Sequence, residues 1–315
     1  MKNKVAGVYF YGGKASQFIA CVFDYFSPGD RWVLDKLHFS SSGEKNLTGG
    51  FDKWAKENQL TDIVVNFPVD STFCETCSLE CPGEDKCHHS GVKQVRDSIN
   101  SVLSRDLNLE KSKPKEYERS RNKQDEVTPR FRPFSSDQSN KLISKGLKKR
   151  LRKGFTPYWN RPIDVFIWLN YYEELSQTFN FSYDSFGHTS LMTIKRFQYL
   201  KKHLSGVSVW ESNVFVGLLE LLREDILGHD DLYGLKFVDE FSVSLRKNIV
   251  SKIEKNLNVF LQNEASAILT FDPKAINAFI LGLAGVSRVK NEIRELPKWC
   301  QEANPSFVVP SYSSD

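Results

Sequence analysis

Residues 5–39 have the sequence VAGVYFYGGKASQFIACVFDYFSPGDRWVLDKLHF, and this stretch decides the expected fold. It contains three apolar and aromatic runs, Val5–Tyr11, Phe18–Phe26 and Arg31–Phe39, which are separated by two short segments containing glycine, serine or proline. Runs bounded by turn residues are typical of strands, and short connections join antiparallel neighbours. The stretch therefore predicts a three-stranded antiparallel meander.

Two further strands are expected, each next to a helix. Phe51–Asn58 has helical character and leads to the β-branched run Ile63–Val65. A strand reached through a helix usually pairs in parallel with an earlier strand. Later, Val207–Trp210 alternates as a strand does, and Val214–Leu222 has the apolar spacing of a helix. The sequence thus predicts an α/β fold with a mixed five-stranded sheet flanked by helices.

The last part of the chain is expected to be mainly helical. Apolar residues recur at about every fourth position from Phe241 to Leu261, which predicts one long amphipathic helix. Another helix should follow Asp272, because Pro273 is favoured in a first helical turn.

The composition indicates a globular protein. Of the 315 residues, 40% are hydrophobic and 26% charged, which is ordinary for a chain that buries a core. Met1–Lys4 passes directly into the first strand, so we expect no secretion signal. The longest apolar candidate, Ala278–Val286, is too short for a membrane helix. We therefore expect a soluble, cytoplasmic protein that makes no membrane contact.

Composition also divides the chain into four parts. Residues 1–104 should hold the first part of the core, and residues 206–315 the remainder. Residues 105–140 are polar, charged and poor in aliphatic side chains, so we expect a surface insertion or a disordered linker. Residues 141–205 form a basic and helical segment.

Four of the six cysteines lie close together, in the pattern Cys74-x2-Cys77-x3-Cys81-x5-Cys87. In a chain without a secretion signal, such clustering favours metal over disulfides. Four thiolates can close a tetrahedral zinc shell, with His88 or His89 as a possible replacement for one of them. An iron–sulfur cluster and a reduced loop without metal are the alternatives. A closed shell leaves no position for substrate, so the zinc would be structural.

Basic side chains gather just after the polar segment. Residues 141–153 contain seven basic residues and no acidic one, although the net charge of the whole chain is only +4. If residues 139–153 form a helix, one face carries a stripe that could follow nucleic-acid phosphates. The stripe comprises Lys141, Lys145, Lys148, Lys149 and Arg152. A solvated helix face is the alternative interpretation.

Arg161 is a further candidate for phosphate, because its guanidinium matches phosphate and carboxylate oxygens. It could equally cap a helix or pair with Asp164. The neighbouring aromatics could stack on bases, but a helix over Pro162–Leu175 would bury several of them, and we expect them to pack in the core. These aromatics are Tyr158, Trp159, Trp168, Tyr171 and Tyr172.

Several segments in order carry a resemblance to a known family. They are Ala6–Val8, Ile63–Pro68, the cysteine run with Val92–Arg96, Thr156–Pro162, Val209–Glu211, Ala275–Ala278 and Val308–Pro310. Together they resemble an uncharacterised family of predicted nucleases with a ribonuclease H-like fold. The resemblance covers nearly the whole chain except the polar segment.

The resemblance implies a site in which several carboxylates hold two Mg²⁺ ions for phosphodiester cleavage. It places acids on the first strand, at the end of the fourth strand and on the last core helix. At these positions the chain has Tyr9, Asn66 and Asn277. We therefore expect the usual catalytic set to be lost. An alternative set of nearby acids, needed only if cleavage survives, would be Glu211, Asp70, Asp24 and Asp272.

Three functions remain open from the sequence. The leading hypothesis is a nuclease-derived protein that binds DNA or RNA without efficient cleavage. The second is an active nuclease that uses Glu211 with divalent metal. The third is an interaction scaffold in which the cysteine loop and the polar segment bind a protein partner.

Overall fold

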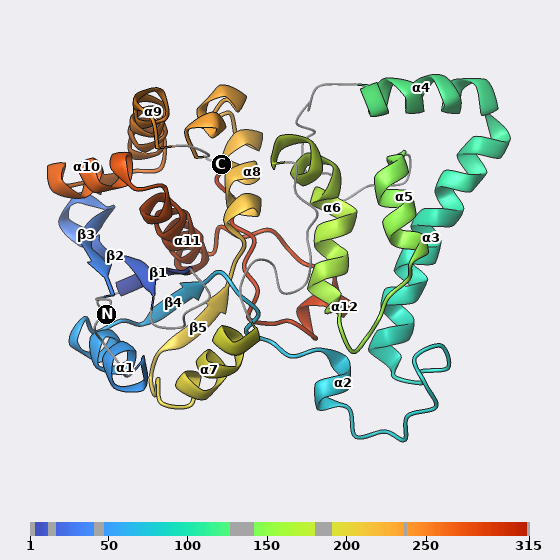
Figure 1. Ribbon diagram of the computed structural model, residues 1–315, viewed down its shortest axis with the longest axis horizontal. Coiled ribbons are helices and arrows are strands. Elements are labelled where there is room, and N and C mark those ends of the chain that lie inside the picture. Colours follow the sequence, from blue (N-terminus) through green and yellow to red (C-terminus); the bar gives the residue numbers. More distant parts are fainter. Residues whose placement is uncertain are drawn as a thin grey trace. The chain divides into compact units, whose positions relative to one another are not determined.

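The computed structural model describes residues 4–11, 17–40, 47–126, 142–179, 191–235 and 238–313 (Figure 1). The chain forms two compact units. The first comprises Met1–Val69, Phe186–Glu295 and Ser306–Asp315, and the second comprises Asp70–Ser185 and Leu296–Pro305. The second unit is thus formed by two separate stretches of chain, each of which is preceded and followed in the sequence by residues of the first unit.

The first unit contains a six-stranded mixed sheet with the order β5-β4-β1-β2-β3-β6. The strands are β1 (Lys4–Phe10), β2 (Phe18–Phe26), β3 (Arg31–Phe39), β4 (Asp62–Val65), β5 (Ser208–Glu211) and β6 (Val259–Leu261). β1, β2 and β3 are antiparallel neighbours, while β4 pairs in parallel with β1 and β5 in parallel with β4. The α/β class and the five predicted strands in one sheet are confirmed, and the predicted strand count is wrong by one.

The additional strand comes from the stretch that we expected to be one long helix. Helix α9 (Glu240–Asn256) ends early, and Asn258 has the left-handed φ of 51°. Its side-chain amide donates to the backbone oxygen of Asp30 at 2.7 Å, which fixes the turn beside β3. After this turn Val259 and Leu261 are buried and Phe260 is exposed, which is the alternation of a strand. β6 then pairs in parallel with β3.

Helices cover both faces of this sheet (Figure 1). On one face, α1 (Leu47–Glu57) and α7 (Leu191–Lys201) contribute to a core with the even-numbered residues of β1 and with β4. On the other face, α11 (Pro273–Lys290) packs on β1, β2 and β4, and α8 (Val214–Arg223) packs on α11. The other helical elements in the described part of the first unit are η1 (Ser27–Gly29), η2 (His229–Leu235) and α10 (Asn263–Phe271).

The contact between α11 and β1 requires glycine. A Cβ atom added to Gly7 would lie 2.1 Å from the backbone nitrogen of Gly282 and 2.2 Å from the backbone oxygen of Ala278. The helix backbone therefore rests directly on the strand. This close approach brings the first turns of α11 next to the carboxyl end of β1.

The second unit is helical within its described residues. Its helices are α2 (Phe73–Thr76), α3 (Ser90–Ser112), α4 (Pro114–Glu126), α5 (Lys145–Arg152), α6 (Pro162–Phe179) and α12 (Lys298–Gln301). The segment Leu296–Pro305 is joined to the rest of this unit by a hydrogen bond, in which the side-chain oxygen of Asn304 accepts from the backbone N–H of Ile163 at 3.0 Å.

Residues 105–126, within the segment expected to be a surface insertion or a disordered linker, are helical apart from Lys113 between α3 and α4. Their composition is polar, but Asp106 and Tyr117 are buried and make polar contacts that replace an apolar core. The basic helix expected over residues 139–153 begins at Lys145, where the Ser144 hydroxyl accepts from the N–H of Leu147 at 3.1 Å. Residues 127–141 lie outside the described residues.

Across the described residues, no single helix is long and apolar enough to cross a membrane. α10 and α11 meet the length and composition criteria only as a pair, and they are bent by 118° at their junction.

Candidate functional site

The carboxyl ends of β1, β4 and β5 lie at one edge of the sheet because the three strands are parallel. At this edge the side chain of Tyr9 is hydrogen-bonded to the side chain of Asn277 on α11, and burial raises the pKa of the Tyr9 hydroxyl. The topology thus brings together two of the three positions at which the resemblance implies acids. Both carry neutral side chains.

Asn66, the third position, is held by β1. Its Oδ1 accepts from the backbone N–H of Phe10 at 3.0 Å, and its Nδ2 donates to the backbone oxygen of Phe10 at 3.2 Å. The amide therefore continues the pairing of β4 with β1 past the last strand residue. An amide used in this way by the backbone has less capacity to serve as a metal ligand.

A small aromatic and charged group lies beside these residues. The rings of Tyr9 and Tyr11 are stacked with centroids 6.5 Å apart, and the Lys274 ammonium lies 4.4 Å from the centroid of the Tyr11 ring. Asp272 caps α11 by accepting from the N–H of Lys274 at 2.8 Å. Burial and then the charge of Asp272 raise the pKa of Tyr11, which shows that this carboxylate lies near the end of β1.

Two of the alternative acids, Asp24 and Glu211, lie outside this group. Asp24 pairs with Lys4 at 3.1 Å and lies opposite it in the register, at the amino end of β1 and therefore at the other edge of the sheet. Glu211 is in register with Val65, and Val65 faces the α1 and α7 side rather than the α11 side. Its Oε2 accepts from the buried N–H of Val69 at 2.9 Å.

Asp70 is the first residue of the second unit. Of the three alternative acids in the first unit, Asp272 is the one that lies beside Tyr11. Among the described residues, no group of three or more histidine, cysteine or acidic side chains is arranged to hold a metal ion. Two-metal chemistry would need several anionic ligands at this edge, and the side chains present do not fit that requirement.

The cysteine loop lies in the second unit and is anchored at both ends. At its start, the backbone N–H of Cys74 donates to the oxygen of Pro157 at 3.4 Å. At its end, Arg96 on α3 donates to the backbone oxygens of Glu84 at 2.5 Å and Asp85 at 3.3 Å. These contacts hold both arms of the loop against neighbouring helical segments.

The four thiols are close enough to influence one another. Burial raises the pKa of Cys74, and Cys87, Cys81 and Cys77 raise it further in that order. The donor set fits zinc in number and in chemistry, although the thiols of the described loop do not form a closed shell. With zinc bound, Cys74, Cys77, Cys81 and Cys87 would be the ligands and the ion would crosslink the loop.

Helix α5 divides its basic residues between a buried and an exposed side. Lys145, Lys149 and Arg152 are exposed and share one face by their spacing of four and three residues. Lys148 lies on the other side with the buried Leu147 and Leu151, and only 8% of it is exposed. The expectation that Lys148 belongs to the phosphate stripe is therefore wrong. Lys141 lies outside the described residues.

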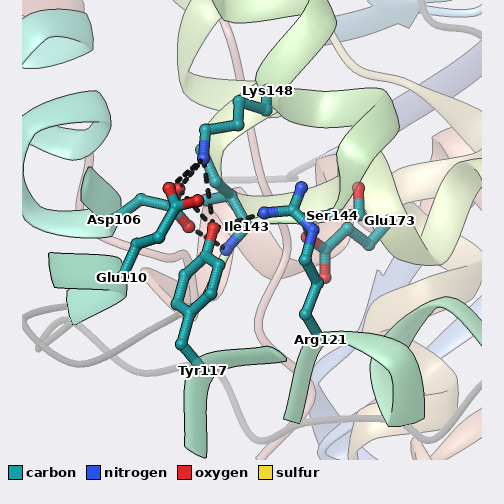
Figure 2. Close-up of polar contacts among 8 residues, drawn as sticks. All are labelled: Asp106, Glu110, Tyr117, Arg121, Ile143, Ser144, Lys148 and Glu173. Carbon is teal, nitrogen blue, oxygen red and sulfur yellow. Dashed lines mark hydrogen bonds and ion pairs between the residues drawn. The ribbon is translucent and has the colours of Figure 1, made fainter. Parts of the chain in front are cut away.

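Lys148 is the centre of a buried polar network (Figure 2). Its ammonium is paired with Asp106, lies 3.6 Å from Glu110 and donates to the Tyr117 hydroxyl at 3.1 Å. The Tyr117 hydroxyl in turn donates to Asp106 at 2.8 Å and is contacted by Arg121. Asp106 also accepts from the backbone N–H of Ile143 at 3.4 Å.

The network joins α3, α4 and α5. Burial alone would lower the pKa of Lys148, but hydrogen bonds to Asp106 and Tyr117 outweigh burial and raise it. Burial also raises the pKa of Tyr117. A general base or nucleophile at neutral pH would need a lowered pKa, whereas the pKa values of Lys148 and Tyr117 are raised. The network therefore stays protonated, and its role is to hold the three helices together. This network was not identified from the sequence, because its residues come from three separate helices.

Arg161 is not a surface arginine. It is 1% exposed and its guanidinium pairs with Asp164 at 3.2 Å, while its backbone N–H donates to the same carboxylate at 2.6 Å. Pairing with Asp164 is therefore the correct alternative. The aromatic set divides: Trp168 and Tyr171 are fully buried as expected, whereas Tyr158 and Trp159 are exposed, contrary to the expectation of core packing.

Comparison with protein-family models finds no match, and comparisons with curated proteins and with solved structures find none either.

Proposed function

We propose that this chain is a nucleic-acid-binding protein built on a ribonuclease H-like core that has lost two-metal cleavage. The observation that carries the proposal is the carboxyl edge of β1 and β4. There Tyr9 and Asn277 bond to each other and Asn66 bonds to the backbone of Phe10, so three neutral side chains stand where the resemblance implies acids.

The strand arrangement supports the choice of core. A ribonuclease H-like sheet begins with three antiparallel strands and continues through a helix into a fourth strand parallel to the first. β1, β2, β3, α1 and β4 follow this order along the chain, and β5 extends the parallel side. β6 adds a strand beside β3, at the edge remote from Asn66 and Glu211.

Charge supports the choice of ligand. The exposed face of α5 carries Lys145, Lys149 and Arg152, and the sequence has no acidic residue from Lys141 to Ile163. A cationic helix face without interspersed acids attracts phosphates, and each contact formed releases counterions. The cysteine loop would carry a structural zinc in the same unit and stiffen the support for this surface.

Cleavage is tested with single-stranded and duplex DNA, RNA and a DNA–RNA hybrid, each with Mg²⁺ or Mn²⁺. We expect no cleavage above background. Metal-dependent cleavage that Glu211→Gln abolishes would overturn the proposed loss of activity. The variant with Tyr9→Asp, Asn66→Asp and Asn277→Asp is the positive comparison, because only it offers three carboxylates at the edge.

Binding is tested as a function of salt. The affinity should fall steeply with salt, and Lys145→Gln, Lys149→Gln and Arg152→Gln together should lower the slope by roughly two to three units. A control of equal charge change comprises Lys53→Gln, Lys247→Gln and Lys255→Gln, which are exposed lysines of the first unit. Absence of binding at low salt would leave the interaction scaffold as the better explanation.

A further inference from the structure

A tight turn at residues 156–160 projects two aromatic side chains from the second unit. The backbone oxygen of Thr156 accepts from the N–H of Trp159 at 3.0 Å and of Asn160 at 2.7 Å. Tyr158 is 60% exposed and Trp159 is 46% exposed, whereas Pro157 and Asn160 on either side are buried. The turn therefore exposes the rings of Tyr158 and Trp159, while the residues before and after them, which form the frame of the turn, are buried.

The frame of this turn is fixed by its neighbours. Phe155 is buried, and its ring packs edge-on against Phe73 with centroids 6.3 Å apart. The oxygen of Pro157 accepts from Cys74 in the cysteine loop. On the other side, Arg161 is locked to Asp164. Rings presented by a fixed backbone lose little entropy on binding, which is a property of good recognition sites.

Packing in the core does not explain why Tyr158 and Trp159 are exposed. The same segment buries Trp168 and Tyr171 completely, so the unit has room for large aromatics inside. Exposing a tryptophan and a tyrosine side by side forgoes the stabilisation that their burial would bring. A binding role explains why the turn presents them.

The chemistry around the turn selects a polyanion. Lys149, Arg152 and Lys153 are exposed and lie within the seven residues before Thr156. Gly154, with a φ of 77°, follows them and turns the chain after the basic helix. On the cysteine loop, Glu80, Glu84 and Asp85 are exposed and disfavour phosphate there. The phosphates of a bound strand should therefore follow α5 rather than the cysteine loop.

We propose that Tyr158 and Trp159 stack on unpaired bases while α5 holds the adjacent phosphates, so that the ligand is single-stranded nucleic acid; this rests on the proposed nucleic-acid binding. Every base has an aromatic face, but in a duplex both faces are already stacked on neighbours. Exposed rings beside a cationic helix thus distinguish single strands from duplexes. Both single-stranded DNA and single-stranded RNA satisfy this chemistry.

The experiment measures fluorescence anisotropy with labelled oligo(dT), oligo(U) and a hairpin duplex of similar charge whose two strands are joined by a non-nucleotide linker. The natural protein should bind the single strands at least tenfold more tightly than the hairpin. Trp159→Ala and Tyr158→Ala should each weaken single-strand binding by roughly 5- to 150-fold, with little effect on the hairpin or on the salt slope. Trp159→Phe should retain most of the affinity, because the ring is kept.

Two controls separate binding from folding. Tyr199→Ala removes an exposed ring of the first unit and should leave binding unchanged. Circular dichroism of Trp159→Ala should match the natural protein, because the ring lies on the surface. If Trp159→Ala nevertheless unfolds, Trp159→Phe and Tyr158→Ala carry the test.

The outcomes distinguish this inference from the proposed function. No binding of any nucleic acid at low salt overturns both. Salt-dependent binding that is equal for single strands and hairpin, and that the aromatic variants do not change, overturns the stacking inference alone. A larger loss with oligo(U) than with oligo(dT), or the reverse, would support stacking and identify the preferred nucleic acid.

Discussion

The side-chain amide of Asn66 bonds to both backbone polar atoms of Phe10, accepting from its N–H at 3.0 Å and donating to its oxygen at 3.2 Å. An amide can do both, whereas an ionised carboxylate at this position can accept from the N–H but cannot donate to the oxygen. The neutral residue at the end of β4 is therefore part of the sheet.

Asn66→Asp should destabilise the first unit by about 1–3 kcal/mol at neutral pH, because it loses one hydrogen bond and places a negative charge beside the Phe10 oxygen. The measurement is urea unfolding. Asn248→Asp, at an exposed position on α9, is the matched control and should change stability by less than about 0.5 kcal/mol. Equal stability of the two variants would mean that the Asn66 amide contributes nothing to the sheet.

Gly7→Ala should be among the most damaging small substitutions in the chain. Its methyl group would lie 2.1 Å from the Gly282 nitrogen and would push α11 off β1, at a cost of about 3 kcal/mol or more. Gly228→Ala is the control, because its nearest contact, with Asp231 at 3.5 Å, is an ordinary one. Thermal unfolding compares the two, and a Gly7→Ala variant with unchanged melting temperature would contradict the direct contact between helix and strand.

Lys148→Met and Lys149→Met should differ sharply although the residues are adjacent. Removing Lys148 leaves Asp106 buried without its cation, which should cost the second unit about 3–5 kcal/mol. Lys149 is exposed, and its replacement should change stability by less than about 0.5 kcal/mol. The double variant of Lys148→Met and Asp106→Leu should recover part of the loss, and similar losses for both lysines would refute the network.

The same network should make the second unit sensitive to alkali. The pKa values of Tyr117 and Lys148 lie above their ordinary values of 10.0 and 10.5, so the folded protein binds these protons more tightly than the unfolded chain. Their contribution to stability is therefore complete below about pH 10 and is lost as the pH rises through the folded pKa values. Tyr117→Phe should show a weaker fall in the urea midpoint between pH 9 and 12 than the natural protein does. Tyr158→Phe, an exposed change, should retain the full dependence.

Protein purified without added metal should contain one zinc ion per chain, as measured by elemental analysis. Cys77→Ser should lose the ion and increase protease cleavage in the loop, because the crosslink is removed. Leu79→Ser is the control within the same loop, since Leu79 is exposed and offers no comparable metal ligand in either form. Iron with brown colour would favour a cluster, and metal-free protein with four reactive thiols would favour the unmetallated loop.

The sheet could be predicted because its signal is local. Apolar and aromatic runs bounded by turn residues mark β1, β2 and β3, and the connections define which strands are parallel. β6 could not be predicted, because the apolar residues of α9 and β6 continue one helical period across Asn258, and the left-handed turn there is decided by its contact with Asp30.

The helices over residues 105–126 escaped prediction for a different reason. Their buried residues are charged or polar, and such residues predict burial only when the partner is known. Lys148 lies forty-two residues after Asp106 in the sequence, so neither composition nor periodicity connects them. The proximity of Tyr9 to Asn277 could be predicted from the strand order. Which aromatic residues are buried and which are exposed could not, because it depends on the turn at residues 156–160, which is held in part by the contact of Pro157 with Cys74.

The second unit needs Leu296–Pro305 to be complete, and the first unit needs Ser306–Asp315. During synthesis from the amino end, the ribosome therefore releases β1–β5 and α3–α6 long before either unit can close. Asn304 is the hydrogen-bond partner of Ile163 in the second unit, and Phe307 pairs with Glu211 in the first. The two residues are only three positions apart, so they are synthesised almost together. Both units should consequently reach their native state as a late, nearly simultaneous step of translation, and a nascent chain stalled before residue 296 should remain bound to chaperones.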